Sequence, residues 1–491
     1  MDRLFAWGCG VALMLVACGG VVPGETESSG SSTTSPEGEL DLPGFVIDGA
    51  KGSDRAVAYP CGDVNGDGLE DLVVNLSEPS SETIDPEEAG VVGVVVYGKV
   101  DHEPIELAEV EAGMGGGRAI IAPSAGCSYA FVGLGDVDGD GFDDLAASYA
   151  MAGVDKTACG GASVILGGPM GTDAIELVAA AAGEGGFALP EPINVYDDNL
   201  AVARIGDLNG DGFDDLGLVN STWYMGADEL FIAFGGDSIV PPTFEALSLG
   251  EGGRALDSPL GPVDAVRGGD INGDGIDDLV IAHGGSPGNI SQEVRVIFGS
   301  AELATVEPTG FTLQVADGLE VDVAAGGDID GDGLDDLVIS DGSRHDGLGG
   351  TYVVFGDAER TDMLLPDELP GAGFIIAAPP VESGGVRRLL APDLSGNGRA
   401  EIAIGHDLSG EPGEAWIVFG KGDGETIALD PLVDSAGYRL SARSEGEYLG
   451  RLVGWAAIGG DPRDLIIADP DAAPNGPGSG RTYVFFKALA P

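Results

Sequence analysis

GDINGDGIDDLVI at residues 269–281 is one copy of a phrase that recurs along the chain. The other full copies are GDVNGDGLEDLVV at 62–74, GDVDGDGFDDLAA at 135–147, GDLNGDGFDDLGL at 206–218 and GDIDGDGLDDLVI at 327–339. A worn copy, PDLSGNGRAEIAI, occupies 392–404, and a shortened seventh, GGDPRDLIIA, occupies 459–468. The last acidic positions of successive copies are 73, 71, 63, 58, 65 and 63 residues apart. A unit of about sixty residues fits one four-stranded propeller blade with generous loops.

The residues around each phrase predict four strands per unit. A short apolar run such as 323–325 precedes the phrase, and a run of β-formers such as 279–281 follows its last acid. A later strand ends in an aromatic residue and glycine, as in VVVYG at 94–98, and a fourth strand begins after a glycine, as in GFTL at 310–313. Helix signals are nearly absent, and Gly and Pro punctuate the chain every few residues, which is typical of all-β folds.

The two ends of the repeat predict how the ring closes. The seventh unit finishes with its third strand at 482–486, whereas GFVI at 44–47 resembles a fourth strand without a unit of its own. Pairing the two would remove an exposed sheet edge. We therefore expect an all-β, seven-bladed β-propeller closed by an N-terminal strand, with six or eight blades as the weaker alternatives.

The acidic phrase has the ligand pattern of a calcium loop. In D-x-[DN]-x-D-G-x-x-D, the side chains at positions 1, 3, 5 and 9 converge, position 7 offers its carbonyl, and the glycine at position 6 lets the chain reverse. Ca²⁺ takes six to eight oxygen ligands. Five complete sets predict about five Ca²⁺ sites: Asp63, Asn65, Asp67 and Asp71; Asp136, Asp138, Asp140 and Asp144; Asp207, Asn209, Asp211 and Asp215; Asp270, Asn272, Asp274 and Asp278; Asp328, Asp330, Asp332 and Asp336.

The phrase has two other interpretations. An EF-hand needs Glu at position 12 between two helices, and here a strand follows position 9 directly. A metal-free acidic turn would bring three or four carboxylates together without a cation, and like charges so close repel one another. The sixth loop keeps oxygens at Asp393, Ser395, Asn397 and Glu401 but has less charge, so weak binding and no binding are both open there. The seventh unit lacks the loop and should be metal-free.

The repeat resembles the FG-GAP repeat of integrin α-subunit N-terminal propellers and of many bacterial surface proteins. The resemblance covers residues 44–487 and rests on the acidic loop followed by Asp-Leu and apolar residues. It implies a propeller that binds calcium on one face and partners on the other. Most members of the family are binding or adhesion modules, and in the relatives that carry an enzyme domain that domain is fused to the propeller.

Composition narrows the classes of partner. Lys and Arg number 22 against 83 Asp and Glu, which gives a formal net charge of -61. A nucleic-acid-binding protein needs a basic face, so nucleic acid is excluded as a partner. An electrostatic hold on anionic lipid is excluded for the same reason. Hydrophobic residues make up 43% of the chain, enough to build a core despite the acidic excess.

The N-terminus predicts export and a lipid anchor. Arg3 precedes an apolar run at 4–16, and Leu-Val-Ala-Cys at 15–18 is similar to the lipobox of bacterial lipoproteins, in which Cys18 would be acylated. An ordinary secretory signal or an uncleaved membrane helix are the alternatives. The expected domains are a signal peptide at 1–18, a flexible Ser/Thr/Gly/Glu-rich tether at 19–43 and the propeller at 44–487. The expected location is the bacterial cell envelope, at the outer membrane or cell surface.

Cysteines and a polar series add two further expectations. Cys127 and Cys159 are expected at one end of the second blade as a disulfide, which export favours, whereas Cys61 should be buried and free.

The residue five places beyond the last loop acid is His283, Asp341, His406 and Asp469 in units four to seven. We expect these residues on the face opposite the loops, as a site for a polar ligand or a second metal. Four unrelated loop residues are the alternative.

The sequence predicts a function in binding rather than catalysis. The expected function is a calcium-stabilised surface or periplasmic binding or adhesion module for an unidentified protein or glycan, held to the membrane by its anchor. The chain shows no Gly-x-Ser-x-Gly, no phosphate-binding glycine loop and no Cys/His zinc spacing. The alternatives are an extracytoplasmic hydrolase or lyase with its site on the non-calcium face, and a purely structural envelope protein.

Overall fold

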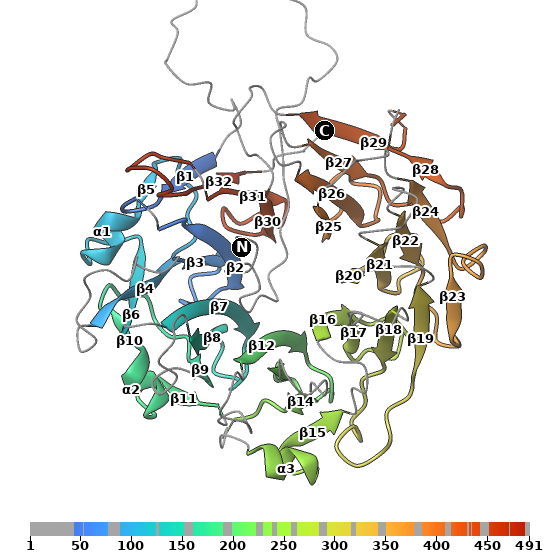
Figure 1. Ribbon diagram of the computed structural model, residues 1–491, viewed down its shortest axis with the longest axis horizontal. Coiled ribbons are helices and arrows are strands. Elements are labelled where there is room, and N and C mark those ends of the chain that lie inside the picture. The colour runs from blue at the N-terminus through green and yellow to red at the C-terminus, as the bar shows by residue number, and fades with distance from the viewer. Residues whose placement is uncertain are drawn as a thin grey trace, which may run out of the picture.

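The fold is a ring of antiparallel β-sheets around a central axis (Figure 1). The computed structural model describes residues 44–486 except 53, 77–88, 124–126, 152–160, 190–198, 222–228, 238–242, 257–262, 284–291, 316–320, 342–349, 378–384, 408–413, 430–431, 434, 442–450 and 471. The expected signal peptide and tether, with Cys18, lie outside these residues. Within the described part of the chain, no helix combines the length and apolar character needed to cross a membrane.

Six sheets are each built from one continuous stretch of chain, with four strands running from the centre of the ring to its rim. Their strands are β2 (Val57–Gly62), β3 (Asp71–Asn75), β4 (Ala89–Val96) and β6 (Gly117–Pro123); β7 (Cys127–Gly135), β8 (Asp144–Met151), β9 (Gly161–Ile165) and β11 (Gly186–Ala188); β12 (Asn199–Gly206), β13 (Asp215–Ser221), β14 (Glu229–Ala233) and β15 (Gly253–Leu256); β16 (Val263–Gly269), β17 (Asp278–His283), β18 (Gln292–Ile297) and β19 (Gly310–Val315); β20 (Val321–Gly327), β21 (Asp336–Asp341), β22 (Gly350–Val354) and β24 (Gly373–Ala377); β25 (Gly385–Ala391), β26 (Glu401–Asp407), β27 (Glu414–Val418) and β29 (Gly437–Ser441).

The remaining sheet is a composite of both ends of the described chain. It joins β30 (Arg451–Ala456), β31 (Asp464–Asp469) and β32 (Arg481–Phe485) to β1 (Gly44–Asp48). The expected count of seven blades is corrected accordingly. Six blades are each completed by their own stretch of chain, and the sheet that closes the ring is not a seventh blade of that kind, because its fourth strand comes from the other end of the sequence.

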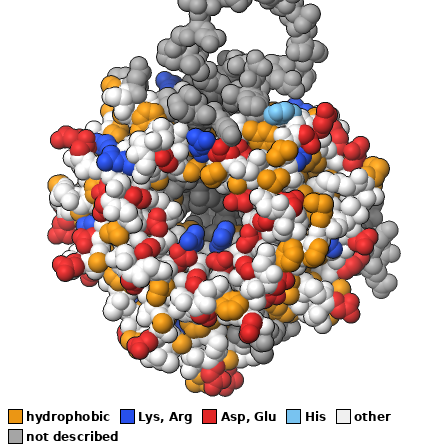
Figure 2. All heavy atoms as spheres, turned by 180° about the vertical axis from the view of Figure 1, so that it is seen from behind, with side chains coloured by type: hydrophobic (Ala, Val, Ile, Leu, Met, Phe, Trp, Pro, Cys, Tyr) orange, Lys and Arg blue, Asp and Glu red, His pale blue; other side chains and the backbone are white. Residues whose placement is uncertain are grey.

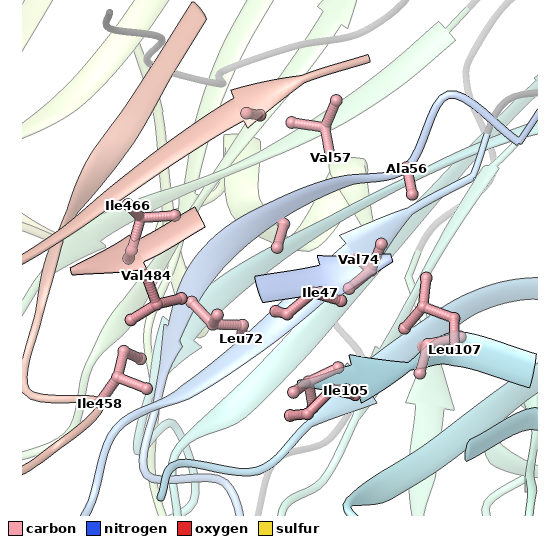
Figure 3. Packing of buried hydrophobic residues seen from close by; sticks show 14 of the residues in the cluster. Ile47, Ala56, Val57, Leu72, Val74, Ile105, Leu107, Ile458, Ile466 and Val484 are labelled. Carbon is pink, nitrogen blue, oxygen red and sulfur yellow. The ribbon is translucent and has the colours of Figure 1, made fainter. Parts of the chain in front are cut away.

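The composite sheet is held by backbone pairing and by one ion pair. β1 runs antiparallel to β32 from Gly44 opposite Phe485 to Asp48 opposite Arg481. The Arg481 guanidinium donates to both carboxylate oxygens of Asp48, at 2.5 and 2.9 Å. Leu72, Ile466 and Val484 fill the space between this sheet and the first blade (Figure 3). Apolar clusters of this kind between adjacent sheets form the core, and burial of apolar side chains there stabilises the ring.

Short elements at the rim join neighbouring sheets. Four two- or three-residue strands add to the outer edge of the preceding sheet in parallel: β5 (Ile105–Glu106) on β1, β10 (Ile175–Glu176) on β6, β23 (Met363–Leu365) on β19, and β28 (Ile427–Ala428) on β24. In the described residues, α1 (Leu107–Glu111) and α2 (Leu177–Ala181) directly follow β5 and β10, and a third helix, α3 (Phe244–Ser248), lies in the connection between β14 and β15. Each buries its first residue and its fourth, which holds it against the sheet.

Candidate cation-binding loops

The five acidic phrases form the connections between the first and second strands of the first five blades. We call them the first (63–71), second (136–144), third (207–215), fourth (270–278) and fifth (328–336) loops. Each first strand ends at the glycine directly before position 1 of its loop, and each second strand starts at position 9. All five loops therefore lie on one face of the ring, which we call the loop face.

The aspartate at position 1 organises the backbone of its own loop. In the first loop, Oδ1 of Asp63 accepts the N–H groups of Gly66 and Asp67 at 2.7 and 3.1 Å, and Oδ2 accepts that of Gly68 at 2.8 Å. Gly66 and Gly68 have positive φ values of 74° and 87°, which glycine adopts without steric cost. Asp136, Asp207, Asp270 and Asp328 make the same three bonds in the other loops.

The aspartate at position 9 is fully buried and links the loop to the third strand. In the second loop, Oδ2 of Asp144 accepts the N–H of Val137 at 2.9 Å, and Oδ1 accepts that of Gly167 at 2.7 Å. Gly167 belongs to the glycine position that follows the third strand. The equivalent glycines 98, 235, 299 and 356 donate to the other four position-9 carboxylates. This bond accounts for the glycine that follows the third strand in each of these units.

Burial makes the position-9 carboxylates costly to ionise. It raises the pKa of Asp71, Asp144, Asp278 and Asp336 to about 7 and that of Asp215 to about 8. Backbone N–H donors oppose this shift, and neighbouring carboxylates of the same loop add to it, such as Asp67 and Asp63 beside Asp71. A cation in the loop would act in the opposite direction, because it favours the ionised form.

The oxygen positions fit a calcium ion. Carboxylate oxygens of Asp136, Asp138 and Asp144 lie within 4.8 Å of one another, as do those of Asp328, Asp330 and Asp332. In the first loop Asn65 is only 4% exposed, and its Oδ1 has no hydrogen-bond partner although its Nδ2 donates to both oxygens of Asp71. A buried amide oxygen without a donor is costly, and a hard cation with oxygen ligands would satisfy it.

The sixth and seventh units differ from these five. In the sixth, Asp393 still organises the backbone, but the fully buried Glu401 accepts from the Leu394 N–H at 2.5 Å and from the Ser395 hydroxyl at 2.8 Å. Both oxygens of this carboxylate are thus used within the loop. In the seventh unit the Arg463 guanidinium donates to both oxygens of Asp461, at 2.8 and 2.9 Å. The carboxylate of the shortened turn is therefore paired with an arginine.

The ligand pattern leaves position 8 undefined, yet the structure gives this position a role. Position 8 carries an acid in each complete loop, and from the second loop to the fifth its carboxylate accepts a hydrogen bond from position 1 of the preceding loop. The recurring Glu-Asp or Asp-Asp pair at positions 8 and 9 was the available signal. Figure 2 shows acidic side chains spread over this side of the ring, with Lys or Arg side chains at the edge of the central opening.

Of the cysteines in the expected propeller, the structure describes Cys61 and Cys127. Cys61 is buried and free, as expected. Cys127 is disulfide-bonded, while its expected partner Cys159 lies outside the described residues.

His283, Asp341 and Asp469 end β17, β21 and β31, and His406 is one residue from the end of β26. These ends lie opposite the loop face. Asp469 Oδ1 accepts the Ala472 N–H at 3.0 Å, and the side chains of the other three lie outside the description. Their role as a ligand site stays a prediction.

Comparison with known proteins places part of this repeat beside an integrin. No family model matches the chain. A stretch of 166 residues is 32% identical to integrin alpha-4 of Xenopus laevis, and it covers 32% of this chain and 15% of the integrin. The BBS1N structure in complex with ARL6DN aligns with a TM-score of 0.40 and 10% identity, over 90% of this chain and 96% of that one. The Dos1 propeller aligns with a TM-score of 0.42 and 9% identity, over 90% and 95%. The chain is thus a β-propeller with a segment similar in sequence to an integrin α-subunit.

Proposed function

We propose that the first five loops bind Ca²⁺ and that the bound ions stabilise the ring. In each loop the side chains at positions 1, 3, 5 and 9 and the carbonyl at position 7 would hold the ion. The observation that carries this proposal is the orphaned, buried Oδ1 of Asn65 in a loop whose other ligands are carboxylates. The convergent carboxylates of the second and fifth loops support it. A divalent cation would offset repulsion among these acids, which is otherwise unfavourable.

The proposed biological role is that of an exported, lipid-anchored binding module. The course of the chain supports an orientation for it. Gly44 pairs with Phe485, which pairs in turn with Leu465, the residue next to position 9 of the seventh unit. The chain therefore enters the ring at the loop face. With an anchor at Cys18, the flexible tether at 19–43 would join the propeller on the side of the loop face, which leaves the opposite face open to a partner.

The partner we propose is a protein or glycan that binds the face opposite the loops. His283, Asp341, His406 and Asp469 are the proposed contacts, because the strands bring their backbones to that face in consecutive units. Binding is proposed rather than catalysis because a stretch of the chain is similar in sequence to integrin alpha-4. A hydrolase or lyase on the same face is the competing function.

Three measurements test this function. Protease shaving of intact cells, followed by detection of the propeller, tests surface display. A glycan array and a pulldown from cell-envelope extract, both with the Cys18→Ser chain, test binding. The double variant His283→Ala/His406→Ala should lose the ligand while keeping its calcium-dependent melting temperature. Turnover in a hydrolase and lyase activity screen that the same double variant abolishes would favour the enzyme instead.

A further inference from the structure

We propose that the cation loops are coupled from blade to blade, and that Asp143, Asp214, Asp277 and Asp335 are the positioning residues that couple them. This inference rests on the proposed cation binding. Each of these carboxylates occupies position 8 of its own loop, beside the position-9 ligand. Each also holds the position-1 residue of the loop in the preceding blade, so one side chain connects two sites.

The second and third loops show the connection in full. The Asp136 N–H donates to Oδ2 of Asp214 at 3.1 Å, and the Asp214 N–H donates back to the Asp136 carbonyl at 3.0 Å. A further bond runs from the Gly236 N–H, after the third strand of the third blade, to the Val137 carbonyl at 2.9 Å. Position 1 of the second loop is therefore fixed by the third blade as much as by its own.

The same bond recurs along the ring. The N–H groups of Asp63, Asp207 and Asp270 donate to Oδ2 of Asp143, Asp277 and Asp335 at 2.7, 3.1 and 2.8 Å. In each case the glycine before position 1 leaves room for the carboxylate. A Cβ on Gly62, Gly135, Gly206 or Gly269 would lie 1.9–2.2 Å from that oxygen. Glycine is thus required at this point by the neighbouring blade's acid as well as by its positive φ.

Two positions in the same chain show the limits of the connection. Position 8 of the sixth unit is Ala400, whose N–H donates to the Asp328 carbonyl at 2.7 Å but which has no carboxylate to return the bond. Glu70, at position 8 of the first loop, follows the seventh unit. Its N–H bonds to the Ala457 carbonyl at 3.2 Å and its carboxylate accepts a bond from the Ala457 backbone, but the seventh unit has no acidic loop for this link to order. The coupled series therefore runs from the first loop to the fifth and stops at both ends.

The geometry implies positive cooperativity between neighbouring loops. A cation bound to Asp215 would fix the adjacent Asp214, and Asp214 orients Asp136, whose own carboxylate shapes the second loop. A loop ordered in advance binds its ion with less loss of conformational freedom, so occupation of the third loop should raise affinity at the second. Linkage makes the effect reciprocal.

The test keeps the second and third loops. The position-5 aspartates are exposed, so Asp67→Ala, Asp274→Ala and Asp332→Ala together should disable the other complete loops without disturbing the core. In this background, calorimetric titration with CaCl₂ reports mainly on residues 136–144 and 207–215. Adding Asp211→Ala, which empties the third loop, should weaken binding at the second loop by about fivefold or more, the lower range of measured site coupling. Asp214→Ala should make the second loop insensitive to Asp211→Ala, whereas Asp214→Asn keeps an acceptor oxygen and should retain most of the coupling.

The matched control is Glu70→Ala, which removes the acid at the same position where no loop precedes it. It should leave the dissociation constant of the second loop unchanged. A dissociation constant of the second loop that is the same with the third loop intact and with Asp211→Ala would overturn the coupling while leaving cation binding intact. An absence of heat in the background itself would overturn both proposals. Melting in EDTA identifies any variant that fails to fold. If Asp214→Ala fails to fold, Asp214→Asn alone must show an intermediate affinity, or the proposal fails.

Discussion

The bond between the third strand and the buried position-9 acid can be tested with two adjacent glycines. A Cβ at residue 167 would lie 2.4 Å from the Asp143 carbonyl oxygen and 2.7 Å from Cβ of Phe142. The 167 N–H donates to the fully buried carboxylate of Asp144 at 2.7 Å, and the chain cannot move away without stretching this bond. Overpacking of this kind costs about 1–3 kcal/mol. A weakened bond to a buried charge adds about 1–3 kcal/mol.

We therefore expect Gly167→Ala to lower the free energy of unfolding by about 2–6 kcal/mol. Gly168→Ala is the control, because a Cβ there meets nothing within 4 Å and the 168 N–H keeps its bond to the Val64 carbonyl. That variant should change stability by about 1 kcal/mol or less. Equilibrium unfolding in urea, with EDTA present, measures both. A difference between the two variants below about 0.5 kcal/mol, the size of an ordinary surface effect, would refute this account of the motif.

Three further predictions concern the loops and the disulfide. Because burial raises the pKa of the position-9 aspartates above the unfolded value near 4, the stability that they contribute when protonated should be lost as pH rises from about 4 to about 7, so the melting temperature in EDTA should be higher at pH 5 than at pH 8. Asp140→Ala should reduce the rise in melting temperature caused by calcium, whereas Asn397→Ala should not, since the sixth loop has only two carboxylates, those of Asp393 and Glu401, at its ligand positions. Non-reducing peptide mapping should recover Cys127 joined to Cys159, and a Cys127 thiol that is alkylated without reductant would contradict that pairing.

The repeat could be predicted from sequence because its signals are local. Positions 1 to 9 of each loop are contiguous, and the second strand begins at position 9 in every described unit, as at Asp71 and Asp278. The orphan strand at 44–47 was also readable, because the last unit lacks a fourth strand. The number of blades was harder to predict. Six blades are each completed by one stretch of chain, whereas the composite sheet depends on pairing between residues more than 400 positions apart.

Other features could not be read because they depend on contacts between units. The bond from Asp63 to Asp143 joins residues 80 positions apart, and nothing in either loop indicates which blade will lie beside it. The helices at the rim are five residues long, too short for an apolar period to appear. The polar series had a correct strand position, but strand position does not determine whether neighbouring side chains share a ligand.

The central claim is that the loops hold calcium, and the melting temperature with and without the ion tests it most directly. Extracellular calcium modules have Kd values of roughly 10⁻⁴–10⁻³ M, so about 1 mM free Ca²⁺ should add on the order of 0.4–1.4 kcal/mol for each occupied site. Five sites together should contribute a few kcal/mol, comparable with the net stability of an ordinary domain. We predict that excess EDTA lowers the melting temperature markedly and that added Ca²⁺ restores it. The same melting temperature in EDTA and in calcium, with no metal retained by native mass spectrometry, would contradict the account.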